Sequence, residues 1–260
     1  MNLDTAHSIL TVTDLAVGYK NSSVAKGINF SLSEGELMAI IGINGIGKST
    51  LLRTLGKVQQ QLSGTIQIEG KPLAHYKAVS LASKISMVLT EPIASKNLSV
   101  LELIALGRQP YTNWIGSLTQ TDTSKINEAI QMLELESLQY KKCYELSDGQ
   151  LQRAMIARAV AQDTPIMMLD EPTTHLDLYH KVQLLKLLQR IAHETKKTIV
   201  FTSHEIEMAL QLCDKILVLD DTTNPFGSPE SLITQKAFDT LFPTDALVFD
   251  SKTKSFRIKK

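Results

Sequence analysis

One glycine-rich segment limits the folds open to this chain more than any other feature. Gly42-Ile43-Asn44-Gly45-Ile46-Gly47-Lys48-Ser49 fits the pattern G-x-x-x-x-G-K-S, and it stands between the apolar run Leu37 to Ile41 and the helix-period run Thr50 to Leu55. A buried strand, a tight loop and a helix, in that order, form the repeating unit of sheets that are covered by helices. The segment therefore predicts an α/β fold with this loop at the carboxyl end of a strand.

Four further apolar runs extend the prediction to a mostly parallel, buried sheet, because each ends in polar sequence and they alternate with helix-period segments. They are Ile85 to Leu89, Ile166 to Leu169, Thr198 to Phe201 and Ile216 to Leu219. The apolar residues of Val182 to Ile191 cover one broad helical face, so this segment is predicted to be a helix packed on the sheet.

Two regions depart from this pattern. The short alternating runs Ile9 to Val17, Ile28 to Leu32 and Ile66 to Ile68 favour a small antiparallel sheet near the N-terminus. Between Glu91 and Gln150 the strand signal disappears, and helices are predicted at Val100 to Leu106 and Ile126 to Leu138 with a loop, Gln109 to Thr123, between them. We expect a single domain over residues 1–260, with a core of residues 1–90 and 162–260 and an inserted helical part of residues 91–161.

Composition narrows the function classes. The 27 lysines and arginines equal the 27 aspartates and glutamates, so the chain lacks the excess of cations that nucleic-acid binding normally requires. No apolar run approaches the 20 or so residues that a membrane-spanning helix needs, and the first residues show no secretory signal pattern. We expect a cytoplasmic protein.

The glycine-rich loop has the chemistry of a triphosphate socket. Gly42, Gly45 and Gly47 let the backbone curl with its N–H groups pointing inward, and the following helix directs its positive dipole end at the same point. Lys48 supplies a cation for the β- and γ-phosphates, and the Ser49 hydroxyl is suited to bind Mg²⁺. A chance strand-to-helix turn is the alternative interpretation.

Polar residues end two other predicted strands, at the edge where open α/β sheets bind ligands. Asp170 is suited to hold Mg²⁺ through water, and Glu171 to polarise the water that attacks the γ-phosphate. His204 follows the strand that begins at Thr198, so it is predicted to lie on the same edge and contact the γ-phosphate. A strand that ends in Asp-Glu is often only a capped turn, and a histidine after a strand is often structural.

With these residues in place, the sequence resembles the ATP-binding subunit of an ATP-binding cassette (ABC) transporter over nearly its whole length. The distinguishing segment is Leu146-Ser147-Asp148-Gly149-Gln150, which is similar to the signature motif of that family and precedes Asp170 in the expected order. The resemblance implies a P-loop NTPase core with a small N-terminal antiparallel β subdomain, an inserted helical subdomain, and ATP and Mg²⁺ as cofactors.

The resemblance also implies how two copies of the chain cooperate. Ser147, Gly149 and Gln150 would close over ATP on the phosphate loop of a second copy, which gives a head-to-tail dimer, and Asp177 would be the key carboxylate of the loop that crosses the interface. Tyr19 stands where the family has an aromatic residue that stacks on adenine. The other implied ATP contacts are Asn44 and Thr50 in and after the phosphate loop.

Two positions depart from the family pattern. Asp148 replaces one glycine of the pair that is usual in the signature, which places a carboxylate near a phosphate site. Thr90-Glu91 stands where the family has a glutamine that senses Mg²⁺ and the membrane subunit, so Thr90 or Glu91 is the expected substitute.

The cargo is indicated by one short stretch. Ala105-Leu106-Gly107-Arg108-Gln109-Pro110-Tyr111 is similar to a segment of cassettes that power import of iron-siderophores, haem or cobalamin, although it is also an ordinary helix end. The resemblance implies two integral membrane permease subunits, an indirect solute-binding protein and a peripheral place on the inner face of the cell membrane. Importers of other solutes, and a soluble ABC ATPase that acts on nucleic acid or ribosomes, are the alternatives.

Overall fold

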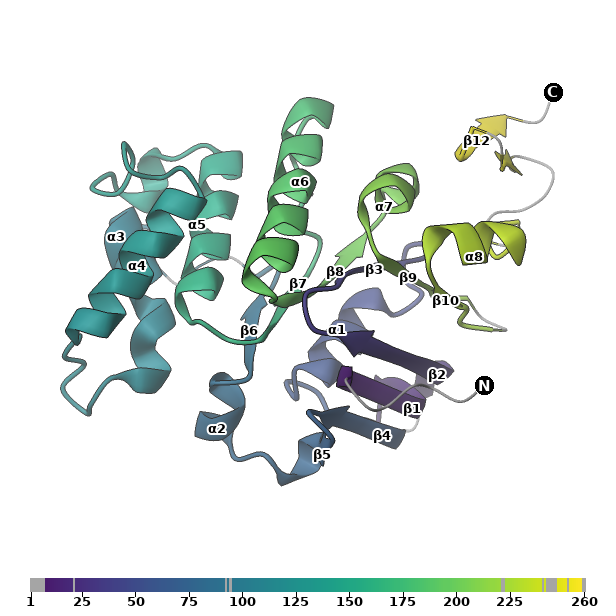
Figure 1. Ribbon diagram of the computed structural model, residues 1–260, viewed down its shortest axis with the longest axis horizontal. Helices are drawn as coiled ribbons and strands as arrows, with labels where there is room; N and C mark the ends of the chain where they lie inside the picture. The colour runs from purple at the N-terminus through teal and green to yellow at the C-terminus, as the bar shows by residue number, and fades with distance from the viewer. Residues whose placement is uncertain are drawn as a thin grey trace. The chain divides into compact units, whose positions relative to one another are not determined.

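The computed structural model describes residues 8–20, 22–91, 93, 95–220, 223–239, 241, 247–251 and 253–258 (Figure 1). Its internal contacts divide the chain into two compact units, one of Met1–Tyr76 with Leu188–Lys260 and the other of Lys77–Leu187. The predicted helical part, residues 91–161, falls within the second unit, and its bounds stay a prediction. The expectation that no secretory signal is present concerns residues 1–7, which lie outside the described residues.

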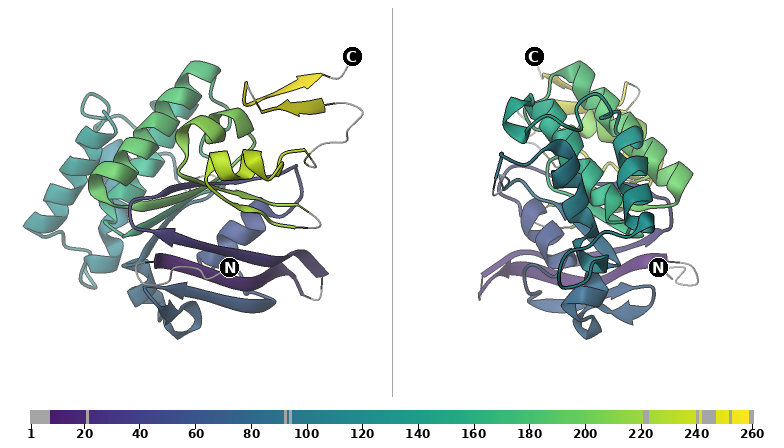
Figure 2. Two further views of the ribbon diagram at one scale, coloured as in Figure 1. Left: turned by 45° about the vertical axis from the view of Figure 1, so that its right-hand side comes forward. Right: turned by 90° about the vertical axis from the view of Figure 1, so that its left-hand side faces the viewer.

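The first unit contains an antiparallel sheet in the order β2-β1-β4-β5. Its strands, seen side by side in Figure 2, are β1 (Ser8–Tyr19), β2 (Ser22–Ser33), β4 (Ser63–Ile68) and β5 (Lys71–Pro72). The side chains of Leu10 and Val12, two residues apart on β1, are fully buried, as the alternating pattern requires. The predicted antiparallel sheet is confirmed.

A parallel sheet in the same unit holds the phosphate loop. β3 (Leu37–Ile41) lies between β8 (Thr198–Ser203) and β9 (Lys215–Val218), is parallel to both, and has all five residues buried. β10 (Phe226–Gly227) pairs antiparallel with β9. The remaining elements of this unit are α1 (Lys48–Leu55), the short 3₁₀ helix η2 (Leu73–His75), α7 (Ile206–Leu212), α8 (Pro229–Thr234) and the hairpin of β11 (Leu247–Asp250) and β12 (Ser255–Ile258).

The second unit combines two parallel strands with helices. β6 (Ile85–Val88) pairs with β7 (Ile166–Leu169), with Val88 opposite Leu169. The helices, blue to teal in Figure 1, are α2 (Ala78–Ala82), α3 (Val100–Ala105), η3 (Leu106–Tyr111), α4 (Gln120–Met132), η4 (Cys143–Glu145) and α5 (Asp148–Ala161). α6 (Leu178–Thr195) begins in this unit.

The predicted helix Ile126 to Leu138 is wrong at both ends. α4 begins earlier, after Thr119, because the Thr119 hydroxyl accepts the Asp122 N–H at 3.2 Å and the Asp122 carboxylate accepts the Thr119 N–H at 2.8 Å. It ends at Met132, since Glu134 adopts a φ of 56°, which no continuing helix admits. The loop between these helices is also shorter than the predicted Gln109 to Thr123. η3 continues to Tyr111 and α4 starts at Gln120.

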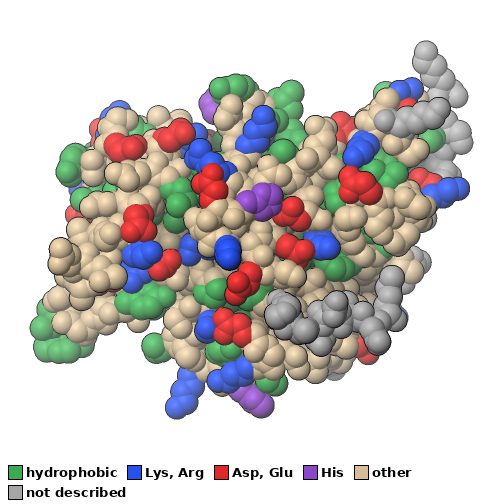
Figure 3. Space-filling model, viewed as in Figure 1, with side chains coloured by type: hydrophobic (Ala, Val, Ile, Leu, Met, Phe, Trp, Pro, Cys, Tyr) green, Lys and Arg blue, Asp and Glu red, His purple; other side chains and the backbone are tan. Residues whose placement is uncertain are grey.

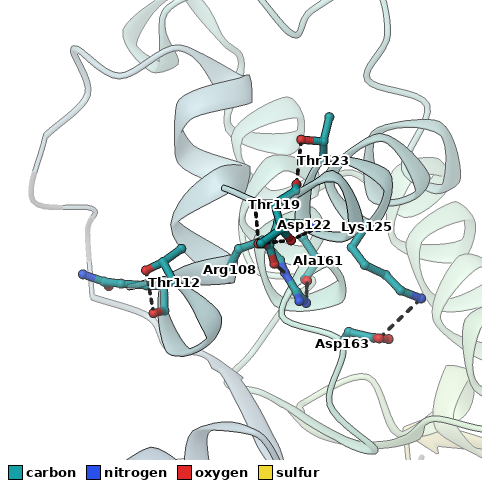
Figure 4. A network of polar contacts seen from close by, with 9 residues as sticks. Arg108, Thr112, Thr119, Asp122, Thr123, Lys125, Ala161 and Asp163 are labelled. Atoms are coloured by element: carbon teal, nitrogen blue, oxygen red, sulfur yellow. Dashed lines mark hydrogen bonds and ion pairs between the residues drawn. The ribbon is translucent and has the colours of Figure 1, made fainter. Parts of the chain in front are cut away.

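A buried ion pair ties η3 to α4 and α5 (Figure 4). Arg108 Nε donates to Asp122 Oδ1 at 2.8 Å, and its Nη1 donates to the Ala161 carbonyl at the same distance. The Tyr111 ring centroid lies 4.1 Å from the guanidinium carbon. Hydrogen bonds from the Thr119 hydroxyl and N–H, with a smaller contribution from Arg108, lower the pKa of Asp122 from 3.8 to about 2. The pair of Arg108 and Asp122 therefore links three helical segments.

We expect Asp122→Ala to lower the free energy of unfolding by about 3 kcal/mol, because it leaves the buried Arg108 charge without its carboxylate. Because the folded pKa lies below the ordinary value, this stabilisation is present above about pH 4 and is lost as the pH falls toward 2. Urea unfolding at pH 7 measures the change. The control is Glu128→Ala, which removes an exposed partner of Lys125 on the same helix and should cost under about 0.5 kcal/mol. Equal effects of the two variants would contradict a special role for Asp122.

Candidate functional site

The phosphate loop joins β3 to α1, and its backbone requires glycine. Gly45 and Gly47 have φ values of 81° and 106°, a region that other residues rarely adopt. A Cβ on Gly47 would also lie 2.6 Å from Cγ1 of Val24. Gly47 is the N-cap of α1 and has no side chain to cap it, and the start of a helix is a place that favours an anion.

Lys48 folds back over this loop. Its ammonium donates to the carbonyls of Gly42 at 3.0 Å and Ile43 at 3.1 Å, and the residue is only 5% exposed. The Lys48 ammonium is therefore held by the backbone of the phosphate loop, where the phosphates of a nucleotide would lie.

His204 reaches the same point from the neighbouring strand. β8 pairs with β3 so that Ser203 lies opposite Ile41, which places His204 beside the start of the loop. Its Nδ1 is 3.3 Å from Lys48 Nζ. Because an ammonium group only donates, Nδ1 is the acceptor and Nε2 is left to carry a proton. The structure thus brings His204 against Lys48 of the phosphate loop, a contact that was not predicted.

Tyr19 stands at the end of β1, close to the first turn of α1. The Thr50 hydroxyl lies 3.4 Å from the Tyr19 hydroxyl, and Tyr19 is 57% exposed. An exposed ring at this place leaves a face on which a flat base could stack. Asn44 is exposed in the phosphate loop.

The acidic residues follow β7 in the second unit. Asp170 is 2% exposed, and its N–H donates to the Val88 carbonyl at 2.8 Å, so it continues the pairing of β7 with β6. Glu171 has a φ of 48°, an uncommon conformation for a residue with a side chain. The Thr174 hydroxyl donates to Glu171 Oε2 at 3.2 Å and orients the carboxylate. Sequence reasoning assigned no such role to Thr174, although its hydroxyl three residues after Glu171 was a usable signal.

Thr90 and Glu91 come shortly after β6. Val88 and Leu169, the last residues of β6 and β7, lie opposite each other. Thr90 follows the end of β6 by as many residues as Glu171 follows the end of β7. The strand register therefore brings the predicted glutamine substitute to the edge that carries Glu171.

The signature segment lines a pocket of about 590 Å³ in the second unit. Ser147 caps α5: its hydroxyl accepts the Gln150 N–H at 3.3 Å, and the Gln150 side chain accepts the Ser147 N–H at 3.0 Å. A Cβ on Gly149 would be 3.1 Å from Leu176, so glycine allows the close approach of the loop before α6. Asp148 and Asp177 line the pocket as well. The residues around it that sequence reasoning did not assign include Glu134, Arg153, His175 and His180.

Oxygen donors at the predicted metal positions fit Mg²⁺. The Ser49 hydroxyl and the Asp170 carboxylate are the hard ligands that this ion prefers. Among the described residues no cluster of three histidine, cysteine or acidic side chains forms a ready-made metal site. Donors of this kind suit a metal that arrives with a phosphate ligand and keeps several waters.

Comparison with known proteins decides the family. A family model described as ABC transporter matches residues 25–174. The chain belongs to the ABC transporter family. The predicted α/β fold and the predicted ATP-hydrolysing cassette are confirmed, whereas the roles of individual site residues stay predictions.

Relatives of this ABC cassette cover nearly its whole length. It is 39% identical to an ABC transporter ATP-binding protein of Methanocaldococcus jannaschii, over 90% of this chain and 81% of the relative. Identity to the ferric enterobactin transport ATP-binding protein FepC of Escherichia coli is 31%, over 91% and 88% of the two chains. Identity to the petrobactin import ATP-binding protein FpuC of Bacillus anthracis is 32%, over 95% and 92%.

Solved structures agree with the cassette assignment. An ABC transporter described as being of the metal-chelate type, in an inward-facing conformation, matches with a TM-score of 0.79 and 30% identity, over 91% of this chain and 89% of the other. The dimeric cassette MJ0796 bound to ADP and phosphate matches with a TM-score of 0.71 and 28% identity, over 83% and 97%. In the part of the cassette that the structure describes, no helix has the length and apolar character to cross a membrane.

Proposed function

We propose that this cassette hydrolyses ATP to power the import of a metal chelate, such as an iron-siderophore, haem or cobalamin, through separate membrane subunits. The observation that carries the cargo class is the similarity, over about nine-tenths of both chains, to proteins named for the transport of ferric enterobactin and the import of petrobactin. The cassette itself would not touch the solute, so its own residues do not identify the cargo. The cargo class is therefore inferred from these relatives.

ATP would bind at the phosphate loop. The N–H groups of the loop and of the start of α1 would hold the phosphate oxygens, and Lys48 would exchange its carbonyl partners for the β- and γ-phosphates. Tyr19 would stack on adenine, with Asn44 and Thr50 close to the nucleotide. Ser49 and Asp170, with Thr90 or Glu91, would hold Mg²⁺, which when bound would offset the charge of the phosphates.

Hydrolysis would depend on Glu171 and His204. The Glu171 carboxylate, oriented by Thr174, would accept a proton from the attacking water as the oxygen of that water bonds to the γ-phosphorus. The bond from the γ-phosphorus to the oxygen that bridges it to the β-phosphate would break, and ADP and phosphate would leave. His204 would donate a hydrogen bond from Nε2 to the γ-phosphate, because its Nδ1 is occupied by Lys48.

A second copy of the chain would complete the site. Ser147, Gly149, Gln150 and Asp177 would meet the nucleotide bound to the partner copy in a head-to-tail pair. All four residues line the pocket of the signature segment, which supports a common role for them. The solved dimer of MJ0796 bound to ADP and phosphate gives independent support for pairing of such cassettes.

Besides the second copy, the cassette would bind two integral permease subunits and, through them, act with a solute-binding protein. It would be peripheral on the cytoplasmic face of the cell membrane.

Basic and acidic side chains are interspersed over the face shown in Figure 3, which agrees with the neutral formal charge and does not favour nucleic acid as a partner.

Capture of the natively expressed cassette from detergent-solubilised membranes tests this proposal. We expect two hydrophobic integral membrane proteins to be recovered with it, and cells that lack the chain to lose uptake of ⁵⁵Fe-labelled siderophore. Recovery with ribosomes or DNA would favour the soluble nucleic-acid alternative. Normal uptake of ferric siderophore, together with loss of uptake of another solute, would keep the importer but overturn the cargo.

A further inference from the structure

The carboxylate of Asp177 is held at the start of α6 by backbone N–H groups and by one side chain, that of His180. The His180 N–H donates to Asp177 Oδ1 at 2.9 Å, and the ring Nδ1 of His180 lies 2.9 Å from Oδ1 and 2.8 Å from Oδ2. A carboxylate only accepts hydrogen bonds, so Nδ1 carries the proton. These bonds, the backbone one first, hold the pKa of Asp177 below its usual range.

The bond from the His180 backbone N–H to Asp177 is usual for a residue that caps a helix. The bond from the His180 ring is not needed for capping. Asp177 directly precedes α6, and its carbonyl accepts the Lys181 N–H at 2.9 Å, so it is the N-cap of the helix. An N-cap needs one carboxylate oxygen. The His180 ring engages the second oxygen as well, and the two side chains remain 66% and 62% exposed.

Stability does not explain this second contact. Ion pairs as exposed as this one contribute little to the free energy of unfolding, because water screens them. What the ring does change is the freedom of the carboxylate, since the one imidazole N–H is shared between its two oxygens and restricts its rotation. The Tyr179 ring meets the His180 ring edge to face at 5.4 Å and supports it.

Asp177 and His180 both line the pocket of the signature segment. The other charged or titratable groups that line it are Glu134 before α5, Asp148 and Arg153 on α5, and His175 and Tyr179 around the start of α6. Arg153 is engaged by Glu134, with Nη1 3.2 Å from Oε2. His180 is therefore the group in this pocket that sets the direction of the Asp177 carboxylate.

We propose that His180 is a positioning residue: it fixes the Asp177 carboxylate, so that this carboxylate accepts hydrogen bonds from a second copy of the chain when two copies pair on ATP. The inference rests on the proposed function, because the second copy arrives only with the nucleotide. His180 does not touch the nucleotide and acts through Asp177.

Two substitutions separate this role from general support of α6. His180→Phe keeps an aromatic ring and the backbone N-cap bond but removes the donor. His180→Asn places an amide N–H where Nδ1 of the histidine stands, one bond beyond Cγ, and so restores the donor. His193→Phe is the matched control, because His193 makes a similar exposed contact, 3.0 Å to Asp214, away from the pocket.

Each change is combined with Glu171→Gln, and the ATP-dependent dimer is measured by size-exclusion chromatography. Binding of a fluorescent ATP analogue to the monomer is measured in parallel. We expect His180→Phe to raise the ATP concentration needed for half-maximal dimer about tenfold with monomer binding unchanged, and His180→Asn to recover most of the loss. His193→Phe should behave like the parent.

Two results would overturn the inference while the proposed function stands: a dimer of His180→Phe that forms as readily as the parent, or an equal defect in His180→Asn. If the parent itself forms no dimer with ATP, the paired mechanism fails, and this inference fails with it.

Discussion

Lys48→Ala is expected to remove ATP hydrolysis and to weaken ATP binding by one to two orders of magnitude. The buried ammonium lies 3.0 Å from the Gly42 carbonyl and 3.1 Å from the Ile43 carbonyl, inside the loop that would hold the phosphates. A hydrogen bond to a charged group contributes about 1.5–3 kcal/mol, which corresponds to roughly a 10- to 100-fold change in affinity. Phosphate release measures the turnover, and titration with a fluorescent ATP analogue measures the binding.

The chain offers a close control for this substitution. Lys57 lies in the same unit and also donates to two backbone carbonyls, those of Ala74 at 3.1 Å and Tyr76 at 2.7 Å. Lys57→Ala should therefore lose a comparable pair of bonds to the backbone and keep the parent's ATPase activity. Hydrolysis by Lys48→Ala at the parent's rate would show that the phosphate loop is not the nucleotide site.

Local features of the sequence predicted the phosphate loop and its strand well. The glycines at positions 45 and 47 are required by the backbone itself, and β3 is buried at all five positions, so a run of apolar residues was a sufficient signal. The strand-end rule also anticipated His204, because the parallel pairing of β3 with β8 brings the two strand ends together.

The sequence was less informative where one polar side chain decides the structure. α4 starts six residues before the apolar pattern begins, because Thr119 and Asp122 cap it. The pair of Arg108 and Asp122 is separated by 14 residues, and nothing in periodicity links them. The contact of Tyr19 with Thr50 joins a strand end to a helix across 31 residues, so residue patterns alone did not predict it.

The start of α6 falls between these cases. Asp177 followed three residues later by His180 has the spacing of a helix cap, and this local signal could have identified His180. What could not be predicted was that the imidazole would turn back to the second carboxylate oxygen, because an exposed histidine has several rotamers and only the folded loop selects one.

Glu171→Gln is expected to bind ATP normally, to hydrolyse it about a thousandfold more slowly, and to accumulate as an ATP-bound dimer. The amide has the shape of the carboxylate and can still accept the Thr174 hydroxyl, which lies 3.2 Å from Oε2 in the parent, but it cannot take a proton from water. General-base catalysis typically contributes a factor of about 10²–10⁴, which sets the size of the effect.

Phosphate release measures the rate of this variant, and size-exclusion chromatography with ATP and with ADP measures the dimer. Glu128→Gln, on the exposed side of α4, makes the same chemical change away from the site and should leave the rate unchanged. Thr174→Val keeps the Glu171 carboxylate but removes the group that orients it, so we expect a smaller loss, about tenfold. If Glu171→Gln hydrolyses ATP as fast as the parent, Glu171 is not the base, and the proton must leave the attacking water by another route.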